Sequence, residues 1–152
     1  MQSLTLSVLL TASLVFGSMP HAQEGKEKMK TEDAASVRAL LGRHFTAINE
    51  LDPEKRKALI AEVYDPHIMF IDPHGIADGR AELDKLYDGI HKRFPGFVFR
   101  VVDDIEAHHE YARVHWELGI PGASEKRSGD DFVKIKDGKI VTLIIFINGQ
   151  TK

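Results

Sequence analysis

Residues 130–147 read DDFVKIKDGKIVTLIIFI, two runs rich in β-branched residues with the pair Asp137-Gly138 between them. An Asp-Gly pair between two such runs is a strong short-range signal for a two-residue β-hairpin. The sequence therefore predicts strands at 130–136 and 139–147. Further strand-like segments precede this hairpin at 97–102, 104–109 and 112–118.

Helical spacing marks the first half of the chain. Apolar residues recur every three or four positions from Glu32 onward, again after Pro53 and again after Gly79, which predicts three helices. Helices gather early and strands adjacent in sequence follow, so the predicted fold class is α+β. We expect a curved antiparallel sheet with the helices packed on one face.

A strand at 67–72 is expected between the second and third helices. Pro66 should end the second helix, because proline lacks the backbone donor that a helix interior needs. Tyr64 then lies on the apolar side of that helix. The segment Pro73-His74-Gly75 breaks the strand before the third helix begins.

Composition limits the domain count and the chemistry. A chain of 152 residues accommodates one compact domain and not two. Its 20 Lys and Arg against 23 Asp and Glu give a formal charge of −3, so we expect no nucleic-acid partner. The sequence has no cysteine, which excludes disulfides, thiol catalysis and cysteine-ligated zinc.

The first 22 residues contain no Asp, Glu, Lys or Arg. Within them, an apolar run at residues 4–16 is too short to span a bilayer. This pattern is typical of a secretory signal peptide at 1–22, followed by a charged flexible lead-in at 23–31 and one domain at 32–149. The protein is then expected to be secreted or periplasmic. A membrane-tethering leader is the alternative.

Asp131 is the first of two acids at positions where a cavity wall is expected. Side chains alternate along a strand, so Asp131 shares a face with Val133 and Ile135. Its neighbour Asp130 falls on the opposite face. Burial disfavours the charged form of a carboxyl, so an inward Asp131 is expected to be protonated and able to donate a hydrogen bond. Alternatively, Asp131 caps the turn after Gly129 or pairs with Arg127.

Asp72 is the second acid. It shares a face with Phe70 and stands at the carboxyl end of its strand, which places it at the rim of the sheet. A carboxylate there can reach a ligand held between the sheet and the third helix, and can act as a general base. The alternative is an Asx turn onto the Pro-His-Gly loop that follows.

His44 lies within the apolar stripe of the first helix, one turn after Leu40 and one turn before Ile48, so it points inward. One interpretation is a core histidine with its hydrogen bonds satisfied. The other is a donor or acid that faces the same cavity as the two aspartates. Tyr64 and Tyr87 also lie on apolar helix faces and are rival phenol donors. Each is equally well explained as a core residue.

Aromatic side chains on the expected strands can line a pocket or form a dimer interface. Periodicity alone does not assign one of these two roles to each candidate. The candidates are Phe70, Phe97, Phe99, Trp116, Phe132 and Phe146.

No metal or cofactor site is expected. Neighbours in a regular strand point to opposite faces, so His108 and His109 should not ligate one ion together. No Gly-rich phosphate loop, nucleophile elbow or cofactor fingerprint occurs in the sequence.

The segment YDPHIMFIDPHGIADGRAEL, residues 64–83, resembles the first-strand region of the nuclear transport factor 2-like superfamily, which includes ketosteroid isomerases and SnoaL-like polyketide cyclases. The segment 130–147 looks like the closing hairpin of these proteins. The resemblance covers about 32–149. It implies a cone-shaped sheet wrapped around three helices, a pocket at the mouth of the cone, and a homodimer formed through the sheet.

The resemblance also implies residue roles. The isomerase general base, an Asp followed by Pro and a Gly-containing loop, matches Asp72. The protonated oxyanion-hole Asp, located just before the closing hairpin, matches Asp131. The third isomerase group, a Tyr on the first helix, is absent here, and His44 occupies about that position.

The expected activity is cofactor-independent acid/base chemistry on a small hydrophobic carbonyl compound. Asp72 would take an acidic proton while Asp131 and His44 stabilise the enolate oxygen, which suits an isomerase or a cyclase. A non-catalytic binder of apolar small molecules and a dimeric assembly domain are the alternatives. The side chains expected to contact the substrate are Phe70, His74, Tyr87, Phe99 and Trp116.

Overall fold

The computed structural model describes residues 33–149. The predicted signal peptide and lead-in lie outside these residues. Among the described residues, no helix combines the length and the apolar character needed to cross a membrane. The elements are helices α1 (Ala34–Asn49), α2 (Pro53–Val63) and α3 (Arg80–Arg93), and strands β1 (Tyr64–Asp72), β2 (Gly75–Asp78), β3 (Val98–Val101), β4 (Glu106–His108), β5 (Tyr111–Gly119), β6 (Lys126–Lys136) and β7 (Lys139–Ile147).

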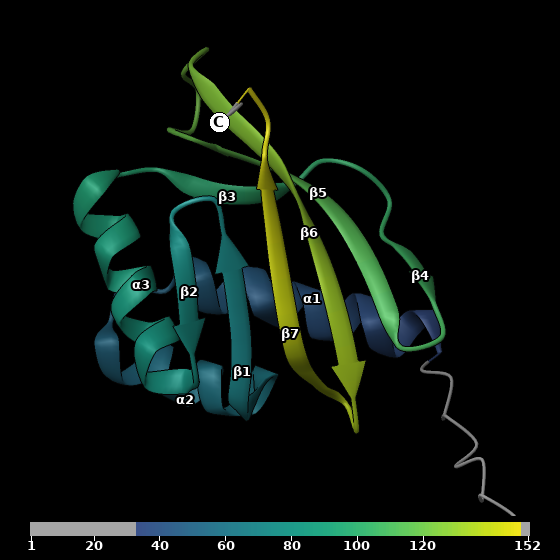
Figure 1. Ribbon diagram of the computed structural model, residues 1–152. Helices are drawn as coiled ribbons and strands as arrows, with labels where there is room; N and C mark the ends of the chain where they lie inside the picture. Colours follow the sequence, from purple (N-terminus) through teal and green to yellow (C-terminus); the bar gives the residue numbers. More distant parts are fainter. Residues whose placement is uncertain (1–32, 150–152) are drawn as a thin grey trace, which may run out of the picture.

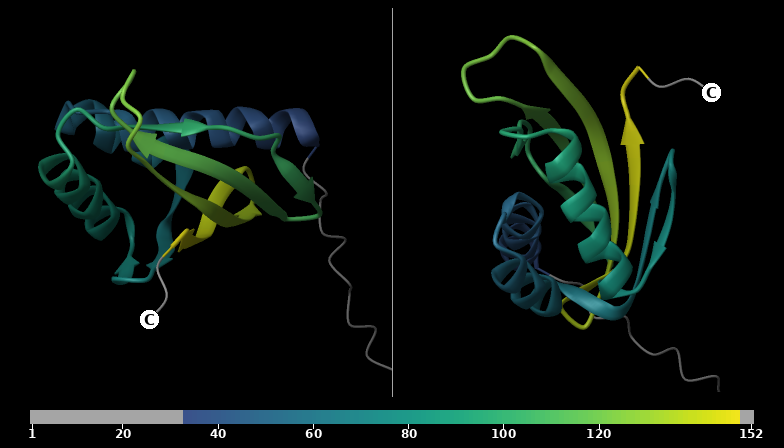
Figure 2. Two further views of the ribbon diagram at one scale, coloured as in Figure 1. Left: turned by 90° about the horizontal axis from the view of Figure 1, so that it is seen from above. Right: turned by 90° about the vertical axis from the view of Figure 1, so that its left-hand side faces the viewer.

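The strands form one curved sheet in the order β2-β1-β7-β6-β5-β3, and β4 also pairs with β5. The sheet bends around the helices, as the views in Figures 1 and 2 show. The α+β class and the curved sheet are therefore confirmed. The expectation of a purely antiparallel sheet is wrong for one pair, because β1 and β7 run parallel. These two strands are far apart in the chain, so no hairpin imposes an antiparallel arrangement on them.

The predicted closing hairpin forms as expected. Asp137 has φ 51° and Gly138 has φ 72°, the left-handed conformations that a type I′ turn requires at both central residues. Lys136 and Lys139 face each other across the turn. Strand β7 has the predicted bounds, whereas β6 begins earlier than predicted, at Lys126.

The junction of α2 and β1 differs from the prediction. Helix α2 ends at Val63 and β1 begins at Tyr64, so Tyr64 is a strand residue and Pro66 does not end the helix. Pro66 lies inside β1 where the pairing with β7 is interrupted, between Tyr64 and Met69. A proline is tolerated in a strand at such an irregularity, because no ladder hydrogen bond is lost there.

Strand β2 was not among the predicted strands. Its four residues pair with the end of β1, so that Asp72 faces Gly75 across a tight turn. The sequence GIAD has only one strongly apolar residue, and that residue, Ile76, is exposed. Backbone pairing with β1 therefore makes this strand, and the sequence pattern alone did not indicate it.

The helices are fixed by caps and by one buried ion pair. The Asp33 carboxylate accepts hydrogen bonds from the first turn of α1, and Asp52 does the same for α2. Between α2 and α3, the buried Arg56 side chain donates to Asp84 at 2.7 Å. The ion pair therefore joins α2 to α3.

Candidate functional site

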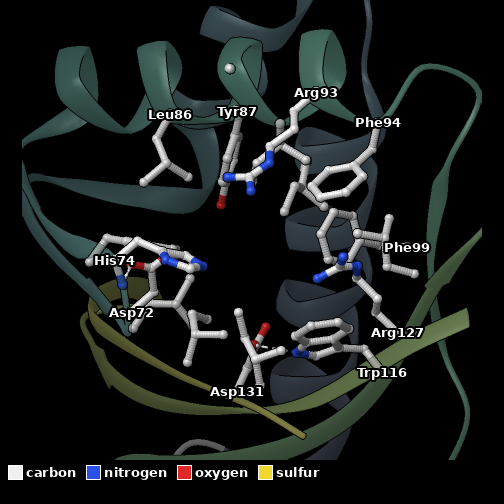
Figure 3. A pocket seen from close by; sticks show the side chains of 18 of the residues that line it. Asp72, His74, Leu86, Tyr87, Arg93, Phe94, Phe99, Trp116, Arg127 and Asp131 are labelled. Carbon is white, nitrogen blue, oxygen red and sulfur yellow. Dashed lines mark hydrogen bonds between the residues drawn. The ribbon is translucent and has the colours of Figure 1, made fainter. Parts of the chain in front are cut away.

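A cavity of about 460 Å³ lies between the concave face of the sheet and helices α1 and α3 (Figure 3). Its volume is within the range of pockets that hold small organic molecules. The wall is mostly apolar and includes Ile48, Leu86, Phe94, Leu118 and Leu143. The cavity can therefore take a compact hydrophobic compound.

All the predicted site residues line this one cavity: His44, Phe70, Asp72, His74, Tyr87, Phe99, Trp116 and Asp131. The structure also separates the aromatic residues that line the cavity from those that do not. Phe132 and Phe146 lie on the outer face of the sheet, 43% and 58% exposed, with ring centroids 5.5 Å apart. Phe97 packs against the edge of the core.

A chain of hydrogen bonds, here called the polar chain, joins five buried side chains beside the cavity. Trp116 Nε1 donates to Asp131 Oδ1 at 2.7 Å, and Asp131 Oδ2 lies 3.1 Å from His44 Nε2. His44 Nδ1 lies 2.5 Å from the Tyr64 hydroxyl, which lies 2.5 Å from the Tyr87 hydroxyl. Asp131 thus pairs with His44 and not with Arg127, and both ring nitrogens of His44 are engaged.

Two sequence periodicities place this polar chain. Asp131 is 3% exposed and shares the inner face of β6 with Val133, as the alternation predicted. His44 is 1% exposed within the apolar stripe of α1, as the helical spacing predicted. The Trp116 indole fits because Gly129, which faces it on β6, has no side chain; a Cβ there would lie 2.4 Å from the ring.

The direction of the hydrogen bonds depends on the protonation of His44 and Asp131. Each phenol has one hydrogen to donate, and the Trp116 indole can only donate. In one state, the pair carries one proton more than a neutral His44 with an ionised Asp131. His44 Nδ1–H then donates to Tyr64, and Tyr64 donates to Tyr87. The Tyr87 hydrogen is left free to point into the cavity. Without that proton, Tyr64 must donate to Nδ1 and Tyr87 must donate to Tyr64.

The Tyr87 hydroxyl points toward the cavity, as Figure 3 shows. Burial raises the pKa of both Tyr64 and Tyr87 far above that of a free phenol, and the nearby Asp131 carboxyl raises both further. The two phenols therefore stay protonated at all physiological pH values. The polar chain ends at the cavity in a neutral hydroxyl.

Asp72 lies half-buried at the rim, and one of its oxygens is engaged. Its Oδ1 accepts hydrogen bonds from the backbone N–H of His74 at 2.8 Å and of Gly75 at 2.9 Å. This is the Asx turn, one of the two alternatives that the sequence left open. Its Oδ2 accepts no hydrogen bond from residues 33–149, so that oxygen is available to a ligand.

The tripeptide Asp-Pro-His occurs twice, once inside β1 (65–67) and once from its last residue into the turn that follows (72–74). In the first copy, Asp65 Oδ1 accepts a hydrogen bond from the backbone N–H of His67 at 2.8 Å, as Asp72 does with His74. Asp65 does not line the cavity, whereas Asp72 does. The chain therefore contains an internal control for any role of Asp72.

Two arginines at the cavity were missed by the sequence analysis. Arg93 and Arg127 both line the cavity and are both exposed, so they lie at its mouth. The sequence pattern does place both residues on the side of the cavity. Arg93 follows Ile90 by one helical turn on α3, and Arg127 lies on the same face of its strand as Asp131 because the two are an even number of residues apart. Arg127 was considered only as an ion-pair partner of Asp131.

His108, the last residue of β4, and His109, which follows it, are not arranged as neighbours in a regular strand would be. His109 lies in a turn with φ 54°, so its ring swings beside His108, with the two Nδ1 atoms 3.5 Å apart. The expectation that they point apart is wrong, because the strand ends at His108. Within residues 33–149, no three His, Asp or Glu side chains gather as a metal site requires.

The curved sheet and the three helices form a nuclear transport factor 2-like fold, which solved structures share. The chain belongs to the SnoaL-like domain family, whose model matches residues 18–143. The resemblance inferred from the segments 64–83 and 130–147 is therefore confirmed. No curated protein matches the chain in sequence.

Solved structures share the fold at low sequence identity. A candidate isomerase of the SnoaL-like family from Agrobacterium tumefaciens is 22% identical with a TM-score of 0.71, over 76% of this chain and 99% of that one. A candidate ketosteroid isomerase from Kribbella flavida is 19% identical with a TM-score of 0.60, over 78% and 82%. A candidate SnoaL-like polyketide cyclase from a Jannaschia species is 12% identical with a TM-score of 0.62, over 75% and 86%.

Proposed function

We propose that this protein binds a small, largely apolar carbonyl compound in its cavity and removes a proton from the carbon beside the carbonyl group. The observation that carries the proposal is that a carboxylate, Asp72, and a neutral donor, Tyr87, line the same apolar cavity. The fold relatives described as candidate isomerases and cyclases support the same class of reaction. Isomerisation and aldol-type cyclisation both begin with this step.

In this proposal, Asp72 is the general base. Its unengaged Oδ2 takes the proton as the C–H bond breaks, and the electron pair moves into the carbonyl to give an enolate. Isomerisation is completed when the same carboxyl returns the proton to a different carbon. The Asx turn of Asp72 onto His74 and Gly75 fixes the carboxylate before substrate arrives.

Tyr87 is the group that stabilises the enolate oxygen. Both oxygens of Asp131 are already bonded, to Trp116 and to His44, so the proposal assigns Asp131 to the support of His44 instead of to direct donation. When the His44–Asp131 pair holds its extra proton, the polar chain leaves the Tyr87 hydrogen facing the cavity. A preorganised donor of this kind stabilises charge that develops during the reaction.

Deuterium exchange into β-tetralone, a compact apolar ketone, tests this proposal. In deuterated buffer, the protein should accelerate exchange at the carbons beside the carbonyl group, observed by NMR. Asp72→Asn keeps the Asx turn and should lower the rate about 100-fold or more. Asp65→Asn, in the other Asp-Pro-His segment, should leave the rate unchanged. If the two variants are equally active, Asp72 is not the base.

A non-catalytic binder is the second candidate. It is favoured by one observation: the groups of the polar chain satisfy one another, so the cavity can hold an apolar ligand without further polar contacts. The two functions separate in one comparison. A binder would retain N-phenylnaphthylamine, a neutral apolar dye, yet give no exchange into β-tetralone above buffer.

The proposal includes export. The charge-free residues 1–22 support a signal peptide and a secreted or periplasmic mature protein. Expression of the full chain followed by mass measurement of the exported form tests this. A mass that matches removal of a leader near residue 22 is expected, and an intact chain retained in the cytoplasm would contradict it.

The proposal also includes a homodimer formed through the outer face of the sheet. Phe132 and Phe146 are both exposed there and pack edge to face. Large exposed aromatics side by side are typical of interaction surfaces. Sedimentation equilibrium should give a dimer for the wild type and a monomer for Phe146→Glu; a monomeric wild type would contradict the dimer.

A further inference from the structure

We infer that the compound bound in the cavity carries an anionic group, a carboxylate or a similar oxyanion, held at the mouth by Arg93 and Arg127. This inference rests on the proposed function, and it names the class of ligand that the proposal left open. It arises from two cations that the mechanism above does not use.

The two arginines approach the same aromatic ring at the cavity mouth. The guanidinium carbon of Arg93 lies 5.6 Å from the centroid of Phe94, and that of Arg127 lies 5.1 Å from it. They come from different elements, the last turn of α3 and the start of β6. In Figure 3 both guanidinium groups point into the space between Tyr87 and Trp116.

Neither arginine has an ionic partner among residues 33–149. Arg56 and Arg113, in contrast, both pair with aspartates, at 2.7 Å and 3.1 Å. The acids that line the cavity do not neutralise Arg93 or Arg127 either. Asp131 is bonded to the polar chain, and no ion pair joins Asp72 to either arginine. Two positive charges therefore face one opening.

Two neighbouring cations repel each other, and an anion placed between them removes that cost. A guanidinium offers a planar fork of donors that matches a carboxylate in a bidentate contact, and stacking on a ring leaves the edge of that fork free. Because both arginines are exposed, the anion would keep contact with water, which limits its desolvation cost. The apolar wall behind Phe94 would then take the rest of the ligand.

Such a ligand is an amphiphile with a fixed orientation. Its anionic end would be bound at the mouth by Arg93 and Arg127, and its apolar body would extend toward Tyr87. This places the far end of the molecule beside Asp72, where the proposed reaction takes place. The arginines thus act as positioning residues that select substrates with a charged end.

Two dyes that share one skeleton test the inference. N-phenylnaphthylamine is neutral, and anilinonaphthalene sulfonate is the same skeleton with an anionic group added. Fluorescence titration gives a dissociation constant for each, and displacement of one dye by the other establishes that they share a site. The double variant Arg93→Met, Arg127→Met removes the cations and keeps apolar side chains that cover Phe94. Arg38→Met, on the exposed face of α1, is the control.

The double variant should weaken binding of the sulfonate dye about tenfold or more and leave binding of the neutral dye unchanged, since charge-assisted pairs are lost only for the anion. The control should change neither. In the wild type, added salt should weaken the binding of the sulfonate dye only. Equal effects on the two dyes, or no effect on either, would overturn the inference and leave the cavity in place. A wild type that binds neither dye would overturn the proposed function as well.

Discussion

His44 Nε2 and Asp131 Oδ2 lie 3.1 Å apart in the interior, although 87 residues separate them in the chain. The contact joins helix α1 to the middle of β6. It also connects two other groups: the Trp116 indole, which donates to Asp131, and the Tyr64 hydroxyl, which bonds to His44 as well as to Tyr87. The pair is therefore both a structural link and the part of the polar chain that sets its direction.

Removal of Asp131 should be costly. Asp131→Ala leaves His44 Nε2 and the Trp116 indole without a partner in the core, and loss of one member of a buried pair typically costs about 3–5 kcal/mol. Asp130→Ala is the matched control, because Asp130 pairs with the partly exposed Arg113 and His115 and should cost about 0–1 kcal/mol. Urea denaturation measures both values. Similar losses for the two variants would show that the buried pair has no special role.

Gly129 and Gly42 should respond in opposite ways to alanine. A Cβ at Gly129 would lie 2.4 Å from both the Phe146 carbonyl oxygen and the Trp116 ring, so Gly129→Ala should destabilise by about 1–3 kcal/mol. Gly42, on the exposed face of α1, has nothing within 4 Å of its Cβ position. Gly42→Ala should stabilise by about 0.5–1 kcal/mol through helix propensity. Thermal denaturation compares them, and a Gly129→Ala as stable as wild type would refute the close packing of Trp116.

Tyr64 and Tyr87 should not ionise while the protein is folded. Burial raises the pKa of both phenols, so neither contributes to the phenolate absorbance until alkaline unfolding. Tyr64→Phe and Tyr87→Phe should therefore leave the absorbance change below the unfolding pH as it is in wild type. A smaller change in either variant would mean that its phenol is accessible to hydroxide.

His91 should make the protein less stable in acid. Its Nε2 is buried and has no hydrogen-bond partner among the described residues, and burial lowers its pKa from the ordinary value of 6.5. The unfolded chain then binds a proton more readily than the folded one, so the free energy of unfolding falls as pH drops from about 6.5 through the lower folded pKa.

His91→Gln should remove that part of the pH dependence, and the exposed His67→Gln should not. Urea denaturation at a series of pH values gives the slopes. Parallel curves for wild type and His91→Gln would contradict the assignment.

Local periodicity predicted the site better than it predicted the sheet. The alternation on β6 and the helical stripe on α1 placed Asp131 and His44 inward, because each depends only on the residues next to it in sequence. Their contact with each other depends on the packing of α1 against the sheet, which no local pattern encodes. The same reason explains why the parallel pairing of β1 with β7 was not expected.

Other features were predicted wrongly or not at all, because the rules applied to them consider only neighbouring residues in the sequence. Pro66 suggested the end of a helix, but an irregular strand accepts it. Strand β2 depends on pairing with β1 and has little apolar pattern of its own. Arg93 and Arg127 line the cavity, yet Arg93 was not considered and Arg127 was considered only as an ion-pair partner of Asp131. Charged residues at inward positions therefore merit the same attention in a sequence as Asp131 received.

A crystal structure of the protein with β-naphthol most directly tests the central claim, that an apolar cavity holds a base and a donor around one small molecule. This planar alcohol resembles the enolate of β-tetralone. The account predicts the naphthol ring inside the cavity, its oxygen hydrogen-bonded to the Tyr87 hydroxyl, and Asp72 beside a ring carbon. A cavity filled by the protein's own side chains, or a naphthol oxygen turned away from Tyr87, would contradict it.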